Sequence, residues 1–285
     1  ETALKWLAAL SSAGFRYDVE RHQGQWAIIL PPARAEDALA ELRAYHRAYL
    51  NWPPPAPEPP PPSATQTHPT FVAAAIVGVL LIWTAWVGPA EGNPAVLDAA
   101  AADLTRIQAG EWWRCITALG LHADAPHVLG NAICLLFFGT AVGQRVGAGV
   151  GWFVVLMTAG VANLLAAWLV PTPRIAFGAS TAAFATLGML AVFRFAYHYD
   201  GLRNLAHIWH RSWVPLAAAV ALLALLGTGA GSDLAGHFLG FAVGAVGACL
   251  ALPLTRRPPN LWLDRLAFAA FVCLLALAWR LALVA

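Results

Sequence analysis

Hydrophobic residues gather in long uninterrupted stretches over most of the chain, and this pattern predicts membrane-spanning helices. From Phe71 onward, apolar stretches recur at roughly the 20-residue length with which a helix crosses a bilayer. The predicted fold class is therefore an all-α polytopic membrane helix bundle. We expect seven spans, at residues 71–87, 127–142, 151–170, 180–195, 214–226, 233–252 and 263–284.

The first 51 residues follow a different pattern. Apolar positions at helical spacing over residues 2–13 and again over 35–50 predict two helices. Between them, alternation over 15–21 and a β-prone run at 26–30 predict two strands. We expect a small α-β-β-α cytoplasmic domain at residues 1–51, a semi-rigid linker at 52–69, which holds nine prolines, and a membrane domain at 70–285.

Composition supports the membrane assignment and limits the classes of binding partner that we expect. Of the 285 residues, 59% are hydrophobic and only 11% are charged, against about 25% charged in soluble domains. The small net charge of +2, without a dense basic patch, excludes nucleic acid as an expected partner and leaves the lipid bilayer. The four cysteines are far apart in sequence and have no metal-type spacing, so we expect neither a metal nor a cofactor.

The basic residues predict the orientation. With the N-terminal domain inside, thirteen Lys and Arg residues fall in inside segments and four fall outside. We therefore expect a multi-pass protein of the cell inner (plasma) membrane with a cytoplasmic N-terminus. The same orientation places His127, Ser180 and His237 at a similar depth, a short way below the outer face.

These polar residues suggest an active site, because hydrocarbon penalises each of them. Ser180 opens the fourth stretch, and His237 in the sixth is suited to take its proton. His127 and Asn131 lie four residues apart on one helix face and could donate to an oxyanion. Because Asp233 is the only acidic residue nearby, a dyad is favoured over a triad. Singly, each residue has a structural explanation; their shared depth favours function.

Small residues recur every fourth position of the sixth stretch, at Gly236, Gly240, Gly244 and Ala248. Such a strip lets helices approach closely in lipid. It would bring His237 within hydrogen-bonding reach of the fourth stretch, although packing alone explains the glycines equally well.

Several short motifs follow one another in a specific order. They are Trp113-Arg114 in the first long loop, His122, His127-x-x-x-Asn131, Gly178-x-Ser180 and Gly236-His237-x-x-Gly240. With these motifs, residues 71–252 resemble the rhomboid family of intramembrane serine proteases. The resemblance implies a six-span core at 70–253 with an extra span at 263–284, and a membrane-embedded loop at 88–126. It implies that Ser180 is the nucleophile, His237 the general base, and His127 and Asn131 the oxyanion stabilisers.

Two positions depart from the family pattern. Thr181 follows the serine, where the family usually has Gly, and its side chain could either crowd the site or bond the helix start. The segment 139–147 contains Gln144 and no Glu, so Arg114 in the loop needs another partner.

The favoured function is an intramembrane serine endopeptidase that cleaves single-span membrane proteins near the outer face, in a water-accessible cavity that His122, His127 and Asn131 could line. An inactive rhomboid-like protein that binds membrane clients is the alternative, although such proteins usually lack the Ser or the His. A small-solute transporter is a third, disfavoured by the absence of an internal repeat and by scarce intramembrane carboxylates. The zinc-protease motif His-Glu-x-x-His does not occur.

Overall fold

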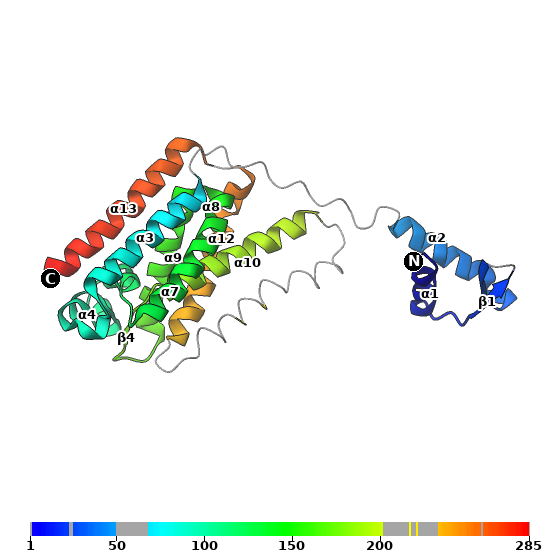
Figure 1. Ribbon diagram of the computed structural model, residues 1–285, viewed down its shortest axis with the longest axis horizontal. Coiled ribbons are helices and arrows are strands. Elements are labelled where there is room, and N and C mark those ends of the chain that lie inside the picture. The colour runs from blue at the N-terminus through cyan, green and yellow to red at the C-terminus, as the bar shows by residue number, and fades with distance from the viewer. Residues whose placement is uncertain are drawn as a thin grey trace. The chain divides into compact units, whose positions relative to one another are not determined.

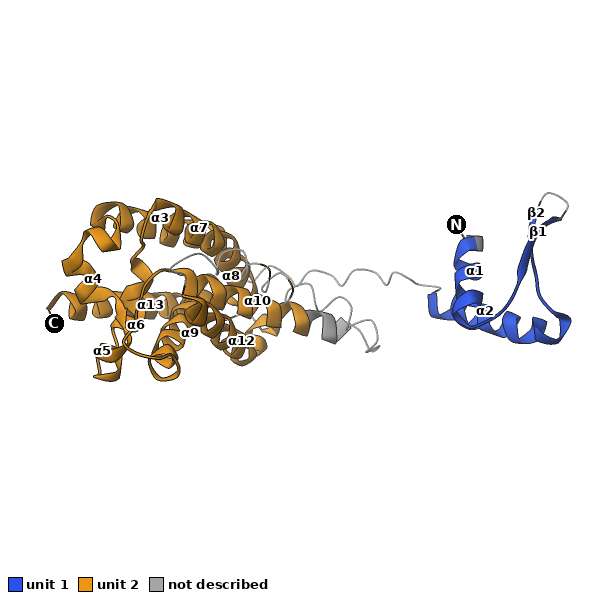
Figure 2. Ribbon diagram, turned by 90° about the horizontal axis from the view of Figure 1, so that it is seen from below, with its two compact units in different colours: residues 1–59 blue, residues 60–285 orange. Residues whose placement is uncertain are grey.

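The computed structural model describes residues 2–22, 25–49, 68–201, 217, 221, 233–257 and 259–284. Most of the predicted linker and of the predicted fifth span at 214–226 therefore lies outside the described residues. The chain divides into two compact units, Glu1–Pro59 and Pro60–Ala285, shown in different colours in Figure 2.

The first unit confirms the predicted order of helix, two strands and helix. Leu10 of the first helix and Ala38 of the second are fully buried, so the two helices share a small core. The strands form an antiparallel hairpin in which Asp18 pairs with Ile29. The elements are α1 Thr2–Ser12, β1 Asp18–His22, β2 Gln25–Ile29, the 3-10 turn η1 Pro32–Arg34 and α2 Ala35–Tyr49.

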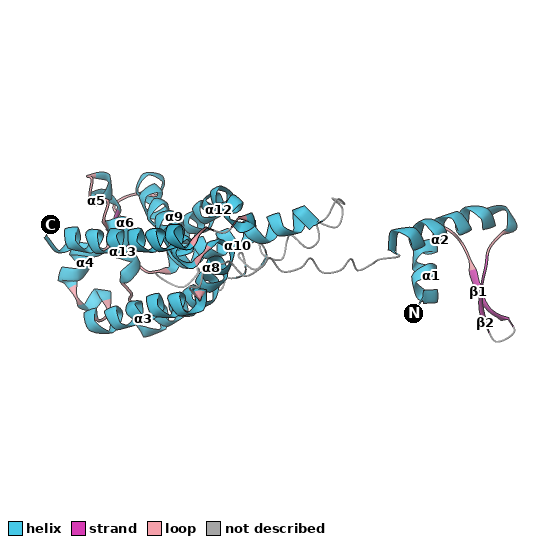
Figure 3. Cartoon of the chain, turned by 90° about the horizontal axis from the view of Figure 1, so that it is seen from above, coloured by secondary structure: helices cyan, strands magenta, loops and turns pink. Residues whose placement is uncertain are grey.

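The second unit is a helix bundle, as predicted (Figures 1 and 3). Five of its described helical segments are long and apolar enough to cross a membrane, and the apolar part of α10, Ser180–Ala196, is shorter. The long helices are α3 Pro69–Val87, α9 Ala148–Leu169, α10 Ser180–Gly201, α12 Leu234–Arg256 and α13 Leu261–Val284. The remaining span comprises α7 Ala125–Cys134, the π-helical η4 Leu135–Gly139 and α8 Thr140–Val146.

Short elements fill the segment between α3 and α7. They are η2 Ala90–Gly92, α4 Pro94–Ala100, β3 Ala102–Asp103, α5 Leu104–Gln108, α6 Arg114–Thr117 and η3 Ala118–Gly120. This segment is tied to the chain just before α10, because β3 pairs with β4 Ile175–Ala176 through Ala102 and Ala176. The Gly178 N–H also donates to the Ala118 carbonyl at 2.9 Å. The approach to Ser180 is therefore fixed by the loop segment.

Helix α9 lies at the centre of the bundle and is the most buried of the candidate spans, whereas α3 and α13 are mostly exposed. Asp264 attaches the start of α13 to α9. Its side chain is 2% exposed and accepts from the Val150 N–H at 3.0 Å, which satisfies a free donor in the first turn of α9. Gly149 allows this contact, because a Cβ there would collide with the Asp264 backbone.

Among the described residues, helices α10 and α12 make the most extensive helix–helix contact. A Cβ placed on Gly240 would lie 2.5 Å from the Thr181 carbonyl oxygen, and one on Gly244 would collide with the Ala185 backbone. In return, Gly188 of α10 lies against the Phe241 carbonyl of α12. The predicted close approach along the glycine strip is confirmed, and it aligns the first turns of the two helices.

Candidate active site

Ser180 and His237 come together at the start of α10 and α12. The Nε2 atom of His237 lies 2.8 Å from Ser180 Oγ, within hydrogen-bonding distance. The His237 side chain is 5% exposed, and its ring stacks on Phe184, one turn beyond Ser180, with centroids 4.6 Å apart. The ring is therefore held between the serine and an aromatic face.

The second ring nitrogen of His237 has no acidic partner in the described chain. Nδ1 is buried and has no hydrogen-bond partner among the described residues. Asp233 uses its carboxylate elsewhere: it accepts from the Gly236 N–H at 3.2 Å, which caps α12, and pairs with Arg174 at 3.0 Å. The arrangement is thus a pair of Ser and His, with Asp233 fixing the helix that carries the histidine.

His127 and Asn131 project from α7 towards the same place. A Cβ placed on Gly178 would lie 3.0 Å from His127 Nε2 and 3.6 Å from Ser180 Oγ, so the three residues are close together. Gly178 has a φ of +129°, which L side chains rarely adopt, so glycine is required there for two reasons. The Asn131 Nδ2 group is buried and has no partner among the described residues, so it is a free donor on a residue that lines the same cavity as Ser180.

These residues line a cavity of about 430 Å³. Charged side chains, among them Glu91, Asp124 and the Arg174–Asp233 pair, contribute to its wall. Apolar side chains complete it, including Phe138 and Phe184. The cavity is therefore suited to an extended peptide with both polar backbone and apolar side chains.

The structure places His122 behind the serine, and it does not line this cavity. It is 1% exposed, and its Nε2 accepts from the Ala179 N–H at 3.3 Å. Its Nδ1 lies 3.5 Å from Thr84 Oγ1 on α3. Burial, and to a smaller degree the neighbouring His127, lower the pKa of His122 to about 4. His122 is therefore neutral at physiological pH and holds the backbone just before Ser180.

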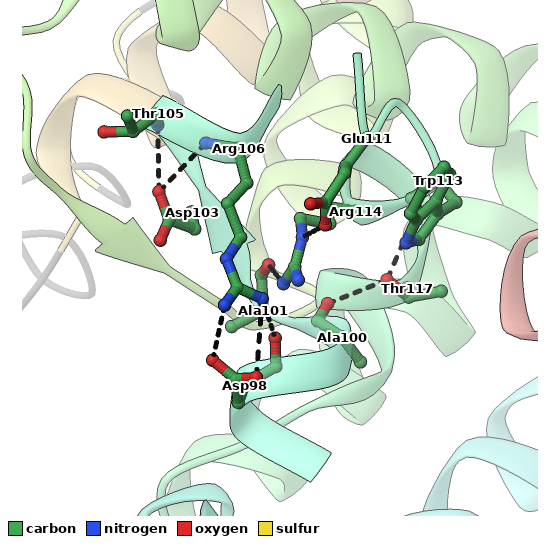
Figure 4. A network of polar contacts seen from close by, with 10 residues as sticks. All are labelled: Asp98, Ala100, Ala101, Asp103, Thr105, Arg106, Glu111, Trp113, Arg114 and Thr117. Carbon is green, nitrogen blue, oxygen red and sulfur yellow. Dashed lines mark hydrogen bonds and ion pairs between the residues drawn. The ribbon is translucent and has the colours of Figure 1, made fainter. Parts of the chain in front are cut away.

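Arg114 finds its partner within its own loop (Figure 4). The guanidinium is 2% exposed; Nε donates to Glu111 at 2.6 Å and Nη1 to the Ala101 carbonyl at 3.0 Å. Thr117 adds a bond to the Ala100 carbonyl at 2.7 Å. Gln144, by contrast, is exposed on α8. Glu111, three residues before Arg114, thus pairs with the arginine in place of the glutamate that the family pattern has at the other position.

Trp113 of the loop and Thr181, which follows the serine, are also placed by the structure. Trp113 is half-buried and packs against the apolar residues beneath the loop. Thr181 is 5% exposed, and its methyl group lies 3.2 Å from where a Cβ on Gly240 would be. Its methyl group therefore lies in the α10–α12 contact, and because Thr181 is absent from the cavity wall it does not crowd the site.

Sequence reasoning missed three supporting residues. Phe184 stacks on His237, Glu111 pairs with Arg114, and Asp124 caps α7 by accepting from the His127 N–H at 2.7 Å. The sequence does contain a signal for the Asp124 cap, because an acidic residue two positions before a proline, here Pro126, is typical of a helix start. Within the described part of the chain, no three His, Cys, Asp or Glu side chains are grouped so as to hold a metal.

Comparison with known proteins assigns the family. A family model described as the Rhomboid domain matches residues 109–254, just over half of the chain. The chain belongs to the rhomboid family. The matched range contains Ser180, His237, His127 and Asn131. With five long apolar helical segments among its described residues, this rhomboid protein is a multi-pass membrane protein.

Two curated relatives are similar to this rhomboid protein. One, rhomboid protease GluP of Bacillus subtilis (strain 168), is 32% identical over 124 residues, or 43% of this chain and 24% of GluP. The other, rhomboid-like protease 2 of Toxoplasma gondii, is 29% identical over 177 residues, or 60% of this chain and 58% of that protein. The chain therefore spans about a quarter of one relative and just over half of the other.

Proposed function

We propose that this rhomboid protein is an intramembrane serine endopeptidase, with Ser180 as nucleophile and His237 as general base. The observation that carries the proposal is the 2.8 Å contact between His237 Nε2 and Ser180 Oγ. A serine hydroxyl becomes a competent nucleophile when a neighbouring base takes its proton. His237 is buried, whereas Ser180 is partly exposed towards the cavity, where a substrate can reach its hydroxyl.

The reaction follows from this contact. As Ser180 Oγ attacks the carbonyl carbon of a substrate peptide bond, its proton passes to His237 Nε2, so Nδ1 carries the proton in the resting ring. The protonated His237 then gives that proton to the leaving amine nitrogen as the C–N bond breaks. A water molecule, deprotonated by the same nitrogen, then attacks the acyl ester carbon. As the ester C–O bond breaks, the protonated His237 returns that proton to Ser180 Oγ, which releases the carboxylic acid product and restores both residues.

The oxyanion formed in each step needs donors that are already in place. The Asn131 Nδ2 group is buried and unpartnered among the described residues, so it loses no existing bond when it donates to the oxyanion. His127 lies beside Gly178 and the serine, and the Ser180 N–H is at the free first turn of α10. We assign the oxyanion site to these three groups.

The substrate class follows from the location of the site. The pair lies at the start of two helices of a multi-pass membrane protein, so a substrate must present its peptide bond at membrane depth. We propose that the substrates are single-span membrane proteins, which are cleaved near the outer face. We also propose that this protein lies in the inner (plasma) membrane of the cell, with its N-terminus in the cytoplasm. A helical substrate has to unwind locally, because helix hydrogen bonds occupy its carbonyl groups.

Cleavage of a single-span model substrate in reconstituted vesicles tests the proposal. We expect Ser180→Ala and His237→Ala each to reduce cleavage by about 10³-fold or more, the scale of losing a nucleophile or its base. Ser11→Ala and His46→Ala make the same substitutions in the first unit and should cleave normally. Wild-type protein that binds the substrate without cutting it would support an inactive, client-binding family member.

A further inference from the structure

The wall of the cavity that contains Ser180 carries more negative than positive charge. Its described charged side chains are Glu91, Asp124, Asp233 and Arg174, so three carboxylates and one guanidinium leave a net charge of −2. Arg174 is already paired with Asp233 at 3.0 Å. The excess charge therefore belongs to Glu91 and Asp124, which we call the acidic rim.

Both carboxylates of the acidic rim are accessible and remain charged without a basic partner. The Glu91 and Asp124 side chains are exposed, and neither forms an ion pair with another described residue. Asp124 uses Oδ1 to accept from the His127 N–H at 2.7 Å, which leaves Oδ2 free of described contacts. Two negative charges are thus available to a ligand that enters the cavity.

The arginines of the loop segment do not neutralise the acidic rim. Arg106 pairs with Asp98 at 3.0 Å, and Arg114 pairs with Glu111 at 2.6 Å (Figure 4). Neither arginine belongs to the cavity wall. The chain that leads into α12 at residues 227–232 reads Gly-Thr-Gly-Ala-Gly-Ser, so its sequence adds no charge. The acidic rim therefore requires a positive charge from outside the loop segment.

A buried donor indicates that the same cavity accommodates a peptide. The Asn131 side chain is 7% exposed and lines the cavity, and its Nδ2 has no hydrogen-bond partner among the described residues. A buried donor without a partner is costly, so a ligand with an acceptor oxygen is expected beside it. A peptide carbonyl is such an acceptor. The side chains of the same bound segment then lie along a wall that includes the acidic rim.

We propose that the acidic rim selects substrates with a lysine or arginine beside the cleaved bond. The inference rests on the proposed function, because it names a side chain that accompanies the peptide bond at Ser180. The substrate's cation pairs with Glu91 and Asp124, whereas an acidic residue at the same place is repelled. Outer flanks of membrane spans carry few Lys and Arg. A basic residue there therefore distinguishes a substrate from most other single-span proteins.

Binding to the Ser180→Ala variant tests the charge preference without requiring cleavage. The probes are transmembrane peptides in bicelles with Lys, Gln or Glu at one position, which is varied along the flanks of the cleaved bond. An exposed ion pair contributes up to about fivefold to an equilibrium constant, and a like-charge contact costs a similar factor. We expect the Lys peptide to bind about tenfold more tightly than the Glu peptide at the best position. The ratio should approach one in about 1 M salt, where the screening length is about 3 Å.

Variants of the acidic rim, made in the same Ser180→Ala protein, assign the preference. Glu91→Gln and Asp124→Asn remove the charge and keep the shape, and Asn still caps the start of α7. The Lys-to-Glu affinity ratio should fall to about threefold in each variant and to about one in both together. Glu91→Lys combined with Asp124→Asn should favour the Glu peptide. Asp98→Asn removes an exposed carboxylate outside the cavity wall and should leave the ratio unchanged.

The outcomes separate this inference from the proposed function. Equal binding of the Lys and Glu peptides at every position, or a Lys preference that persists without both rim charges, would overturn the inference. Cleavage by the protein with Ser180 intact is a separate measurement. A Lys preference in binding without cleavage of any peptide would uphold the charge selection and overturn the proposed function. Cleavage of both peptides with equal rates and equal binding would do the reverse.

Discussion

The helix pairs α10–α12 and α3–α13 both belong to the membrane bundle, but they meet in opposite ways. In α10–α12, glycines on both helices place the backbones in direct contact. Helices α3 and α13 instead line an apolar cavity together, and the side chains of Trp83 and Trp279 meet with ring centroids 4.5 Å apart.

The difference shows what glycine contributes in a lipid environment. Apolar side chains gain little by leaving lipid for each other, so close contact depends on small residues and shape. The α10–α12 contact has that shape, and it holds Ser180 and His237 within hydrogen-bonding distance of each other. The α3–α13 pair has large side chains and retains space between its helices. The closely packed helix pair is therefore the one that carries Ser180 and His237, the two side chains that meet.

The largest effect is expected from breaking the tight contact. In Gly244→Ala the new Cβ would collide with the Ala185 backbone, so α10 and α12 must separate. A displacement of about 1 Å between reacting groups can cost about 100-fold in rate, and we expect a loss of that size in substrate cleavage. Gly78→Ala in α3 is the matched control, since nothing lies within 4 Å of its Cβ position. Equal rates for both variants would contradict the role of the glycine contact.

The next effect concerns His122, which links α3 to the backbone before Ser180 and lies outside the membrane spans. Its pKa in the folded protein is about 4, whereas it is about 6.5 when unfolded. Above pH ~6.5 the ring is neutral in both states; between ~6.5 and ~4 the unfolded state takes up the proton first, so stability falls as pH falls. The loss is on the order of 3 kcal/mol.

Thermal unfolding of wild type and His122→Gln at several pH values measures this loss. Gln can still accept from the Ala179 N–H but does not titrate in this range. We expect wild type to lose stability relative to the variant as the pH decreases towards about 4.5. Parallel pH profiles would show that His122 is not held neutral.

A smaller effect is expected where Asp264 attaches α13 to α9. Asp264→Ala removes the buried acceptor of the Val150 N–H, and we expect a loss of about 1–3 kcal/mol in the free energy of unfolding. The control Asp98→Ala breaks an exposed pair with Arg106 and should cost about 1 kcal/mol or less. Chemical denaturation in detergent compares them. If the two variants are equally stable, Asp264 does not anchor α13.

The smallest effect is expected at the rim of the cavity. Arg174→Ala removes the partly exposed pair with Asp233 but leaves the Asp233 cap on Gly236 intact. An ion pair of this exposure is expected to stabilise the local structure by about 0.2–1 kcal/mol. If all of that energy serves to position the site, cleavage should slow by about fivefold at most when the pair is lost. Asp233→Ala, which also removes the cap, should slow it further. A larger loss from Arg174→Ala than from Asp233→Ala would assign Arg174 a direct part in substrate binding.

The sequence predicted the bundle, the first unit's element order and the residues that meet at the site. Apolar stretch length and glycine spacing are local signals, and the shared depth of Ser180, His127 and His237 follows from topology alone. Local spacing could not predict that Glu111 pairs with Arg114 or that Phe184 stacks on His237, because these contacts depend on how the loop and helices pack. The prediction that His122 lines the cavity was wrong, because topology gives the depth of a residue in the membrane but not the direction of its side chain.

Covalent labelling tests the central assignment most directly. The protein is treated in lipid with a fluorophosphonate, which reacts with activated serines, and the adduct is located by peptide mass spectrometry. We predict one adduct, on Ser180, that forms in wild type and is lost in His237→Ala although Ser180 is still present. Labelling of Ser180 that is unchanged in His237→Ala, or a wild-type protein that forms no adduct at Ser180, would contradict the account.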